Sequence, residues 1–390
     1  TWPTVISLTQ AKCFANQVGY PVLIRPSYVL SGSAINIVFS EEDLAQFLIQ
    51  AAKISPEHPV VLSKFIVKAK ELEVDGVAKE GRIIIEAVSE HIENAGMHSG
   101  YATMVLPPQN LDLETIRRTK LIRRQIVKAL EITCPFNIQF VVKGNSIQVI
   151  EYNLRGSRSF SFVSKVTCHN FIEIATRVLL DQPISDIFKT LEFDYVGIKS
   201  PQFSYQRLKE TSSVAHVEMA SIGKVACIDR DLQEAFFLSW MTKQIRIKRK
   251  KILFRIGGDK KNKLLKLIKA LADCRWKIFA TQGTHDFLKS HQAASQCIYK
   301  RSQKKQPDLS SFIKKGYFDL IINIPKGTGA NPITDGFHIR RLSIDHHIPL
   351  ITHLQNAQVF LSCLVDLNLK SLLILPSQRF ATISEKRSNK

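Results

Sequence analysis

Residues 1–185 mix short apolar runs, which are typical of strands, with stretches of helical periodicity. The predicted helices are 8–18, a segment that begins at Glu41 after the capping residue Ser40, 113–130 and 171–180. The predicted strands are 20–24, 35–39, 60–65, 72–77, 82–88, 136–142 and 146–150. The last two strands form a hairpin that turns at 143–145. We therefore expect an α/β domain over residues 1–185.

From residue 251 onwards the pattern changes to a regular alternation of strands and helices. The predicted strands are 251–256, 276–280, 320–324 and 349–352, and the predicted helices are 263–272, a helix that reaches residue 291 after a loop at 281–284, 309–315, 337–346 and 357–367. Such alternation is typical of a parallel sheet with helices on both faces. We therefore predict a Rossmann-like, doubly wound domain over 248–380. Residues 186–247 are irregular and are interpreted as a linker region, and 381–390 form a basic tail.

The composition of the 390 residues is that of a soluble multidomain protein, with 45% hydrophobic and 23% charged residues. No apolar run approaches the length that a bilayer requires, and the N-terminus lacks the regions of a signal peptide, so we expect a cytoplasmic protein without membrane contact. Seven scattered cysteines without a C-x-x-C pair favour reduced thiols. A start at Thr1 rather than Met is consistent with a fragment or a processed product.

The net charge of +20 is compatible with binding of nucleic acid, with binding of a small phosphorylated molecule, or with plain solvation. The basic stretch 245–251 carries no interleaved aromatic residues, so base stacking is not indicated. We therefore consider nucleic acid the least supported partner.

The most informative motif follows the second strand of the predicted hairpin. Glu151 and Asn153 lie two positions apart and so share one face of a strand, and Gln139 lies on the preceding strand. One carboxylate with one or two amide oxygens suffices for Mg²⁺, and Arg155 and Arg158 would neutralise charge on a transferred phosphoryl group. The motif therefore indicates a site for a divalent metal and a polyphosphate. The alternative is a strand end with a solvated cluster of salt bridges.

Three further segments have chemistry of their own. The small residues of 31–33 let backbone amides approach an anion that Arg25 could reach. The segment 90–100 is rich in His, Glu and Gly without apolar periodicity and predicts a site loop, with a plain surface loop as the alternative. Thr281 and Thr284 bracket Gly283 at a strand-to-helix junction where free N–H groups attract anions, with simple N-capping as the alternative.

Taken together, the segments 25–30, 90–100, 137–140, 151–155 and 158–165 resemble the second ATP-grasp unit of the carbamoyl-phosphate synthetase large chain. The resemblance continues through 196–204 and 217–219 into a methylglyoxal-synthase-like regulatory domain, carried by 318–323 and 340–343. Residues 201–204 and 327–335 are most similar to the animal, multifunctional branch of the family that serves pyrimidine synthesis.

This resemblance implies that the chain phosphorylates carbamate to carbamoyl phosphate with ATP and Mg²⁺ or Mn²⁺. The implied ATP-binding residues are Arg25, Lys64, Ile66, Glu71, Gly96, Met97, His98, Ser99, Gln139 and Glu151. The implied metal ligands are Gln139, Glu151 and Asn153, and the implied catalytic residues are Arg155, Arg158 and His91. A phosphorylated effector, either a nucleotide or phosphoribosyl pyrophosphate, is expected at Lys260, Thr281, Thr284, Lys300 and Asn323. No methylglyoxal synthase activity is expected, because a shared fold does not carry chemistry.

Departures from the family pattern leave two hypotheses open. Tyr101 stands where the family usually has an acidic residue beside the nucleotide loop, and the N-terminal synthetase and glutaminase parts are not in the chain, so we expect them as partners. The first hypothesis is a working part of a carbamoyl-phosphate synthetase. The second is a catalytically impaired module that binds a nucleotide or a partner chain.

Overall fold

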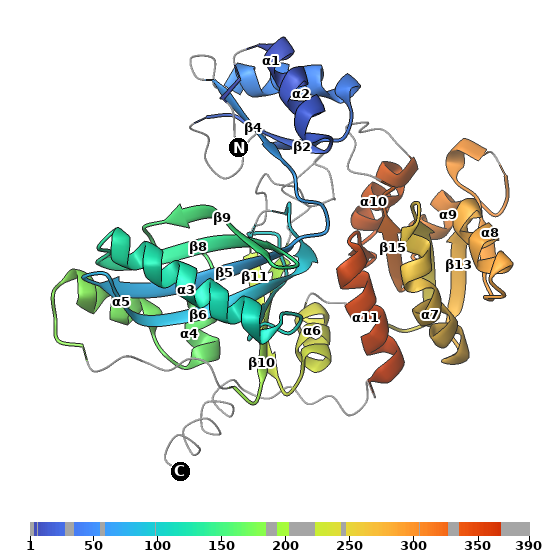
Figure 1. Ribbon diagram of the computed structural model, residues 1–390. Helices are drawn as coiled ribbons and strands as arrows, with labels where there is room; N and C mark the ends of the chain where they lie inside the picture. The colour runs from blue at the N-terminus through green and yellow to red at the C-terminus, as the bar shows by residue number, and fades with distance from the viewer. Residues whose placement is uncertain are drawn as a thin grey trace.

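The computed structural model describes residues 4–5, 7–27, 35–54, 59–97, 99–184, 193–202, 223–242, 247–303, 305–326 and 335–367. These residues form three sheets with flanking helices (Figure 1). The predicted anion-binding loop 31–33, His98, the insertion 327–334 and the basic tail lie outside the described residues.

The smallest sheet is N-terminal and antiparallel, with the strand order β1-β4-β2-β3. Its elements are β1 (Thr4–Val5), β2 (Val22–Arg25), β3 (Asn36–Val38), β4 (Val60–Lys64), α1 (Leu8–Val18) and α2 (Glu41–Ile54). Both helices pack on it through one apolar cluster that includes Phe14, Ile24 and Leu62. The capping role of Ser40 is confirmed, since its hydroxyl accepts a hydrogen bond from the Asp43 N–H at 3.4 Å.

The central sheet has seven antiparallel strands in the order β11-β10-β7-β6-β5-β8-β9. Its strands are β5 (Lys70–Lys79), β6 (Arg82–Asn94), β7 (Met104–Leu106), β8 (Cys134–Lys143), β9 (Ser146–Asn153), β10 (Val196–Gln202) and β11 (Gly223–Asp229). The predicted hairpin is therefore present as β8 and β9. Two strands from the predicted linker region, β10 and β11, complete the far side of this sheet, so these residues are part of its framework.

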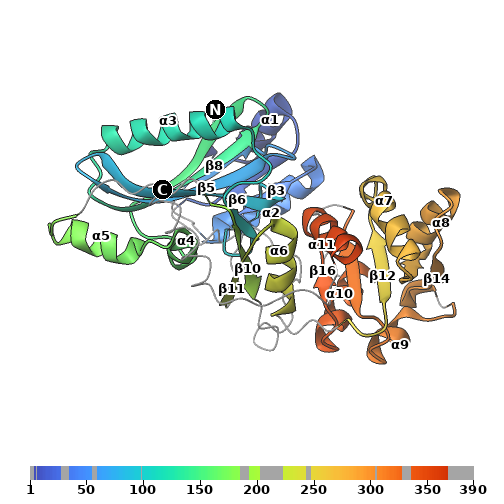
Figure 2. The same cartoon turned by 90° about the horizontal axis from the view of Figure 1, so that it is seen from below.

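Helices cover both faces of the central sheet (Figure 2). One face carries α3 (Leu113–Ala129) and, further along, α6 (Leu232–Met241), while the other carries α4 (Phe160–Thr167) and α5 (Phe171–Leu179). Under α4 and α5 the sheet presents apolar side chains such as Val77, Ile85 and Ala87. This apolar half of the face borders the polar half that forms the candidate site.

The C-terminal sheet has five parallel strands in the order β14-β13-β12-β15-β16. Its strands are β12 (Lys251–Ile256), β13 (Lys277–Thr281), β14 (Gln296–Ile298), β15 (Leu320–Ile324) and β16 (Leu350–Ile351). Its helices are α7 (Lys260–Asp273), α8 (Gln282–Ser290), the short 3-10 helix η1 (Arg301–Gln303), α9 (Leu309–Lys314), α10 (Asp335–Asp345) and α11 (Leu354–Asp366). Separate apolar clusters lie on its two faces, which confirms the doubly wound prediction.

Two local predictions are wrong. The segment 90–100 was expected to be a loop, but β6 continues to Asn94, because β5 and β7 supply backbone partners on both sides. The loop expected at 281–284 is also absent, because α8 begins at Gln282 and takes Gly283 into its first turn. In both places a polar or glycine-containing segment was expected to be irregular, although a strand extends into the first segment and a helix begins within the second.

Candidate functional site

The predicted metal-binding residues meet on the β8–β9 hairpin. Gln139 is the direct cross-strand partner of Glu151, and Asn137 is the partner of Asn153, with an irregularity in the ladder just after Gln139. Directly paired residues project from the same face of a sheet. Glu151 is exposed, and Gln139 and Asn153 are half-buried, so their oxygens are accessible to a ligand. One carboxylate with two amide oxygens fits a Mg²⁺ ion that keeps phosphate and water in its shell.

Next to this hairpin, β5 carries a row of acidic residues that the sequence analysis missed apart from Glu71. Glu71, Glu73 and Asp75 lie at alternate positions of the strand, so they share one face, and all three are buried. Glu73 pairs with Gln139 in the ladder and Asp75 with Asn137, which places this row beside the predicted metal ligands. Acidic residues at alternate positions of a predicted strand were the signal that could have revealed this row.

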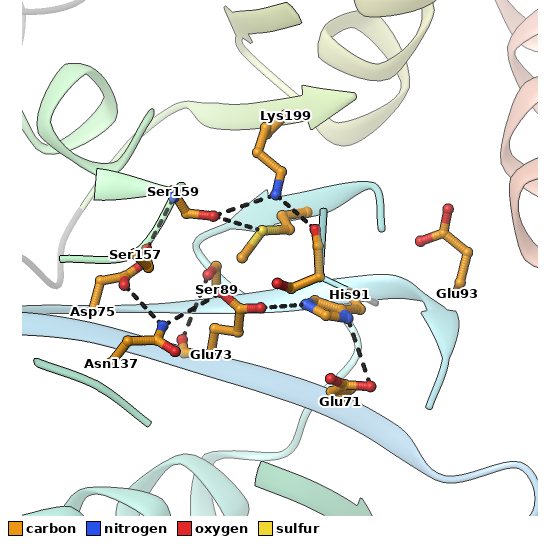
Figure 3. Close-up of polar contacts among 12 residues, drawn as sticks. Glu71, Glu73, Asp75, Ser89, His91, Glu93, Asn137, Ser157, Ser159 and Lys199 are labelled. Carbon is orange, nitrogen blue, oxygen red and sulfur yellow. Dashed lines mark hydrogen bonds and ion pairs between the residues drawn. The ribbon is translucent and has the colours of Figure 1, made fainter. Parts of the chain in front are cut away.

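His91 lies between two of these carboxylates (Figure 3). Its Nε2 is 3.2 Å from Oε1 of Glu73, and its Nδ1 is 3.9 Å from Oε2 of Glu71. Burial alone would lower the pKa of His91, but the charges of Glu71 and Glu73 and the hydrogen bond to Glu73 outweigh it and raise the pKa. This shift favours the imidazolium form, whose positive charge balances the negative charge of the buried row.

The carboxylates differ in their protonation. Burial raises the pKa of Glu71 to about 7, and the negative charges of Glu73 and Glu151 add to this effect. Burial and the charge of Glu73 raise the pKa of Asp75 to about 7 as well. Burial alone would also raise the pKa of Glu73. The hydrogen bond from His91 and the positive charge of His91 outweigh burial, however, and lower the pKa. Glu73 is thus the ionised member of the row, and Asn137 donates to it at 3.5 Å and to Asp75 at 2.9 Å.

Lys199 closes the site from β10. Its side chain is fully buried, and Nζ donates to the carbonyl of Ser99 at 3.1 Å and to the hydroxyl of Ser159 at 3.3 Å (Figure 3). Burial lowers the pKa of Lys199, while the charges of Glu73, Asp75 and Glu93 oppose the shift. Lys199 therefore joins the predicted nucleotide segment to the turn that follows Arg158. In the sequence, Lys199 stands out only as a member of the segment 196–204, because a lone lysine in a strand is no sign of burial.

Arg155 and Arg158, the two predicted phosphoryl-binding arginines, lie on the turn between β9 and α4 and are exposed. Arg155 donates from Nη2 to Oδ1 of Asn153 at 3.3 Å, and the carbonyl of Arg158 accepts from Lys224 on β11 at 2.8 Å. Ser157, between the two arginines, bonds to Asp75. The turn is thus anchored to the acidic row while its guanidinium groups remain accessible.

The remaining predicted nucleotide residues form the border between the first two sheets. Arg25 ends β2 and is exposed, Ile66 is half-buried, and Nζ of Lys64 donates to the carbonyls of Gly19 and Tyr20 at 2.6 and 3.1 Å. Gly96 has a φ of 107°, and a Cβ there would lie 2.8 Å from the ring of Phe65, so the position requires glycine. Met97 and Tyr101 are buried together, so Tyr101 faces inward at the position where the resemblance leads us to expect an acid.

The two glutamates of the segment 90–94 form hydrogen bonds that hold neighbouring parts of the fold together. Glu90 accepts from the backbone N–H groups of Gln109 and Asn110 at 2.9 and 2.8 Å. Glu93 accepts from the N–H and the hydroxyl of Thr103 at 2.8 and 3.0 Å. Within the described ranges, no group of three or more His, Cys, Asp or Glu side chains has the arrangement of a metal site, and the amide-rich hairpin set remains the candidate.

The predicted effector residues gather at the carboxyl ends of the parallel strands, where ligands bind in such sheets. Thr281 ends β13 and Asn323 lies near the end of β15, and both are buried. Lys260 begins α7 and donates to the carbonyl of Pro325 at 2.8 Å. The capping alternative is wrong, because Thr281 makes no side-chain cap, and the Thr284 hydroxyl accepts from the N–H of Ile256 at 3.1 Å.

Comparison with known proteins relates both the N-terminal and the C-terminal part of the chain to known protein families. Residues 3–187 match the family described as "Carbamoyl-phosphate synthase L chain, ATP binding domain", and residues 263–352 match the "MGS-like domain". The chain belongs to the carbamoyl-phosphate synthase family. The predicted family and fold class are therefore confirmed.

Members of the carbamoyl-phosphate synthase family match nearly the whole chain. It is 44% identical over 375 residues to the multifunctional protein pyr-3 of Neurospora crassa, covering 93% of this chain and 20% of that protein. It is also 44% identical over 369 residues to the mitochondrial carbamoyl-phosphate synthase (ammonia) of Rattus norvegicus, covering 92% of this chain and 24% of that protein. The chain thus spans about a quarter or less of the length of these relatives.

Among solved structures, the chain is similar to the biotin carboxylase domain of 2-oxoglutarate carboxylase from Hydrogenobacter thermophilus. The identity is 16% and the TM-score 0.49, over 59% of this chain and 58% of that one. In the part of the chain that the structure describes, no helix has the length and apolar character to cross a membrane.

Proposed function

We propose that this chain is the part of a carbamoyl-phosphate synthase that phosphorylates carbamate with MgATP. The γ-phosphoryl group would pass from the terminal bridging oxygen of ATP to a carbamate oxygen, which gives ADP and carbamoyl phosphate. The observation that carries this proposal is the direct pairing of Gln139 with Glu151 beside the buried row of Glu71, Glu73 and Asp75. Such a transfer depends on positioning and on neutralisation of charge, and no covalent nucleophile is needed.

The site residues divide this work among them. Gln139, Glu151 and Asn153 would hold a Mg²⁺ or Mn²⁺ ion, which when bound neutralises phosphate charge. Arg155 and Arg158, exposed on their anchored turn, would bind the transferred phosphoryl group as bidentate donors. His91 would keep Glu73 ionised and oriented rather than touch the substrate, because it is buried between Glu71 and Glu73. Glu71 would accept hydrogen bonds from the ribose.

The remaining predicted roles are part of the same proposal. Arg25, Lys64, Ile66 and the segment 96–99 would border the nucleotide. Residues 1–185 would form the ATP-grasp domain, 186–247 the linker region and 248–380 the regulatory domain. The latter would bind a phosphorylated effector, a nucleotide or phosphoribosyl pyrophosphate, at the strand ends near Lys260, Thr281, Thr284, Lys300 and Asn323. Full activity would require N-terminal synthetase and glutaminase parts as partners.

Formation of carbamoyl phosphate and ADP from carbamate and MgATP tests the proposal. The chain should show this turnover when the upstream synthetase parts are supplied. A second candidate, a module that binds nucleotide without turnover, is favoured by the buried Tyr101. Mg²⁺-dependent binding of ATP without any turnover, even with those parts present, would establish the second candidate instead.

A further inference from the structure

Two arginines that were not among the predicted effector residues lie at the same edge of the C-terminal sheet. Arg255, near the end of β12, donates from Nη1 to Oδ1 of Asn323 at 2.9 Å. Arg340 on α10 is only 7% exposed, and its Nε has no hydrogen-bond partner among the residues that the structure describes. Within the described residues, neither arginine forms an ion pair. A buried guanidinium with an unsatisfied donor is costly, so its persistence requires an explanation.

The two guanidinium groups share one small region. A Cβ on Gly336, in the first turn of α10, would lie 2.6 Å from Cζ of Arg255, so Arg255 packs directly against that turn. Arg340 follows Gly336 by four positions and therefore lies on the same side of the helix. Burial lowers the pKa of Arg340 to about 10, and the positive charge of Arg255 contributes to the shift. Two like charges thus face each other at the end of the sheet.

The described part of the chain offers little negative charge to balance them. Asp335 is the carboxylate whose charge acts on Arg255, but it also lies 3.7 Å from Nζ of Lys300 and accepts from the Ser302 hydroxyl at 2.7 Å. The neighbouring segment 327–334 contains no acidic residue in its sequence. Among the described residues, the pair therefore has no carboxylate that it does not share with other groups.

Hydrogen bonds connect the pair to the predicted phosphate position. The Thr284 hydroxyl bonds to the backbone of Ile256, the residue after Arg255. Asn323 accepts from Arg255 and donates from Nδ2 to the carbonyl of Gly336 at 2.9 Å. Thr284, Arg255, Asn323 and the start of α10 therefore form one continuous edge across the ends of β12 and β15.

We propose that Arg255 and Arg340 form a second anion subsite, which takes a second phosphoryl group of the effector. The inference rests on the proposed effector function and sharpens it: the effector class is a diphosphate or pyrophosphate ester, since a monophosphate would leave the two guanidinium groups unpaired. Paired guanidinium groups suit such a group, because each can donate two parallel hydrogen bonds to phosphate oxygens.

Calorimetric titration of the full chain with inorganic phosphate and with inorganic pyrophosphate tests this subsite. The unmodified chain should bind pyrophosphate about tenfold more tightly or better. Arg255→Met and Arg340→Met should reduce that preference to about twofold and leave phosphate affinity almost unchanged. Arg341→Met is the matched control. This substitution removes the same charge from α10, but Arg341 already pairs with Asp345 at 2.8 Å.

Thermal unfolding separates a binding role from a structural one. If Arg340 binds an anion, the Arg340→Met variant without ligand should unfold at the same temperature as the unmodified chain or at a higher one. Pyrophosphate should no longer stabilise the variant. A lower unfolding temperature with an unchanged preference for pyrophosphate would assign both arginines to packing and overturn the proposal.

Thr281→Ala distinguishes this failure from failure of the effector site itself. The variant should bind both phosphate and pyrophosphate more weakly. Any anion binding that is unchanged in this variant takes place at another site, such as the ATP site. If phosphate binds in a Thr281-dependent way but Arg255→Met retains the pyrophosphate preference, only the second subsite is wrong. If Thr281→Ala changes nothing, the proposed effector function is wrong.

Discussion

Asn356 on α11 donates a hydrogen bond of 2.7 Å from Nδ2 to Oε1 of Glu93 on β6. The donor and acceptor are separated by 263 positions in the sequence and belong to the C-terminal and central sheets, respectively. Glu93 lies two residues from His91 on the same face of β6, so this bond joins the helices of the predicted regulatory domain to the strand that carries His91, next to the strand of the acidic row. Around it, α6 and α11 share one apolar cluster.

We expect Asn356→Ala to weaken the influence of an effector on ATP affinity. A bond to a charged group contributes about 1.5–3 kcal/mol, and its loss removes one polar link between the two halves. ATP affinity should be measured by calorimetry with and without saturating pyrophosphate. Gln358→Ala, on the same helix, is the control. Equal coupling in both variants would show that the apolar contacts alone connect the halves.

Lys199→Met should destabilise the chain by about 3 kcal/mol, because the variant leaves the carbonyl of Ser99 and the hydroxyl of Ser159 without their buried donor and removes the positive charge that acts on Glu73. Denaturant unfolding followed by circular dichroism measures this loss. Lys165→Met removes an exposed lysine from α4 and should stay within about 0.5 kcal/mol of the unmodified chain. A similar small effect of both variants would mean that Lys199 does not compensate the row.

Asp75→Asn should make stability less dependent on pH. The pKa of Asp75 is raised from 3.8 to about 7 in the folded chain. Between these two pH values the folded chain therefore keeps the proton on Asp75, while the unfolded chain releases it. The stability that Asp75 contributes is therefore present below pH 4 and is lost as the pH rises through 7. The variant should be more stable than the unmodified chain at pH 8, by about 2 kcal/mol, and similar to it at pH 4.

Denaturant unfolding at both pH values measures this difference, with the exposed Asp345→Asn as the control. A variant that is less stable than the unmodified chain at pH 8 would show that Asp75 is ionised and satisfied in the folded state.

The sequence predicted the parts of the site that depend on local pattern. The alternation in β8 and β9 with a glycine turn determined the hairpin, and its register brought Gln139 opposite Glu151. The parallel C-terminal sheet followed in the same way from alternating strands and helices.

The buried charges could not be predicted in this way. In β5, alternating acidic and apolar residues are equally typical of a strand with one face in water, and only contacts with distant parts of the chain bury Glu73 and Asp75. Lys199 and Arg340 depend on the same kind of long-range contact. Burial of these side chains is a property of the assembled sheets rather than of any local segment.

The rate of carbamoyl phosphate formation by a Glu151→Gln variant tests the central claim most directly. The substitution keeps the size of the side chain and removes the one carboxylate of the predicted metal set. With MgATP, carbamate and the upstream parts supplied, we expect a loss of about 100-fold or more in turnover, together with loss of Mg²⁺-dependent ATP binding. The control Glu114→Gln, on an exposed residue of α3, should retain full activity. Unchanged turnover by Glu151→Gln would contradict the account.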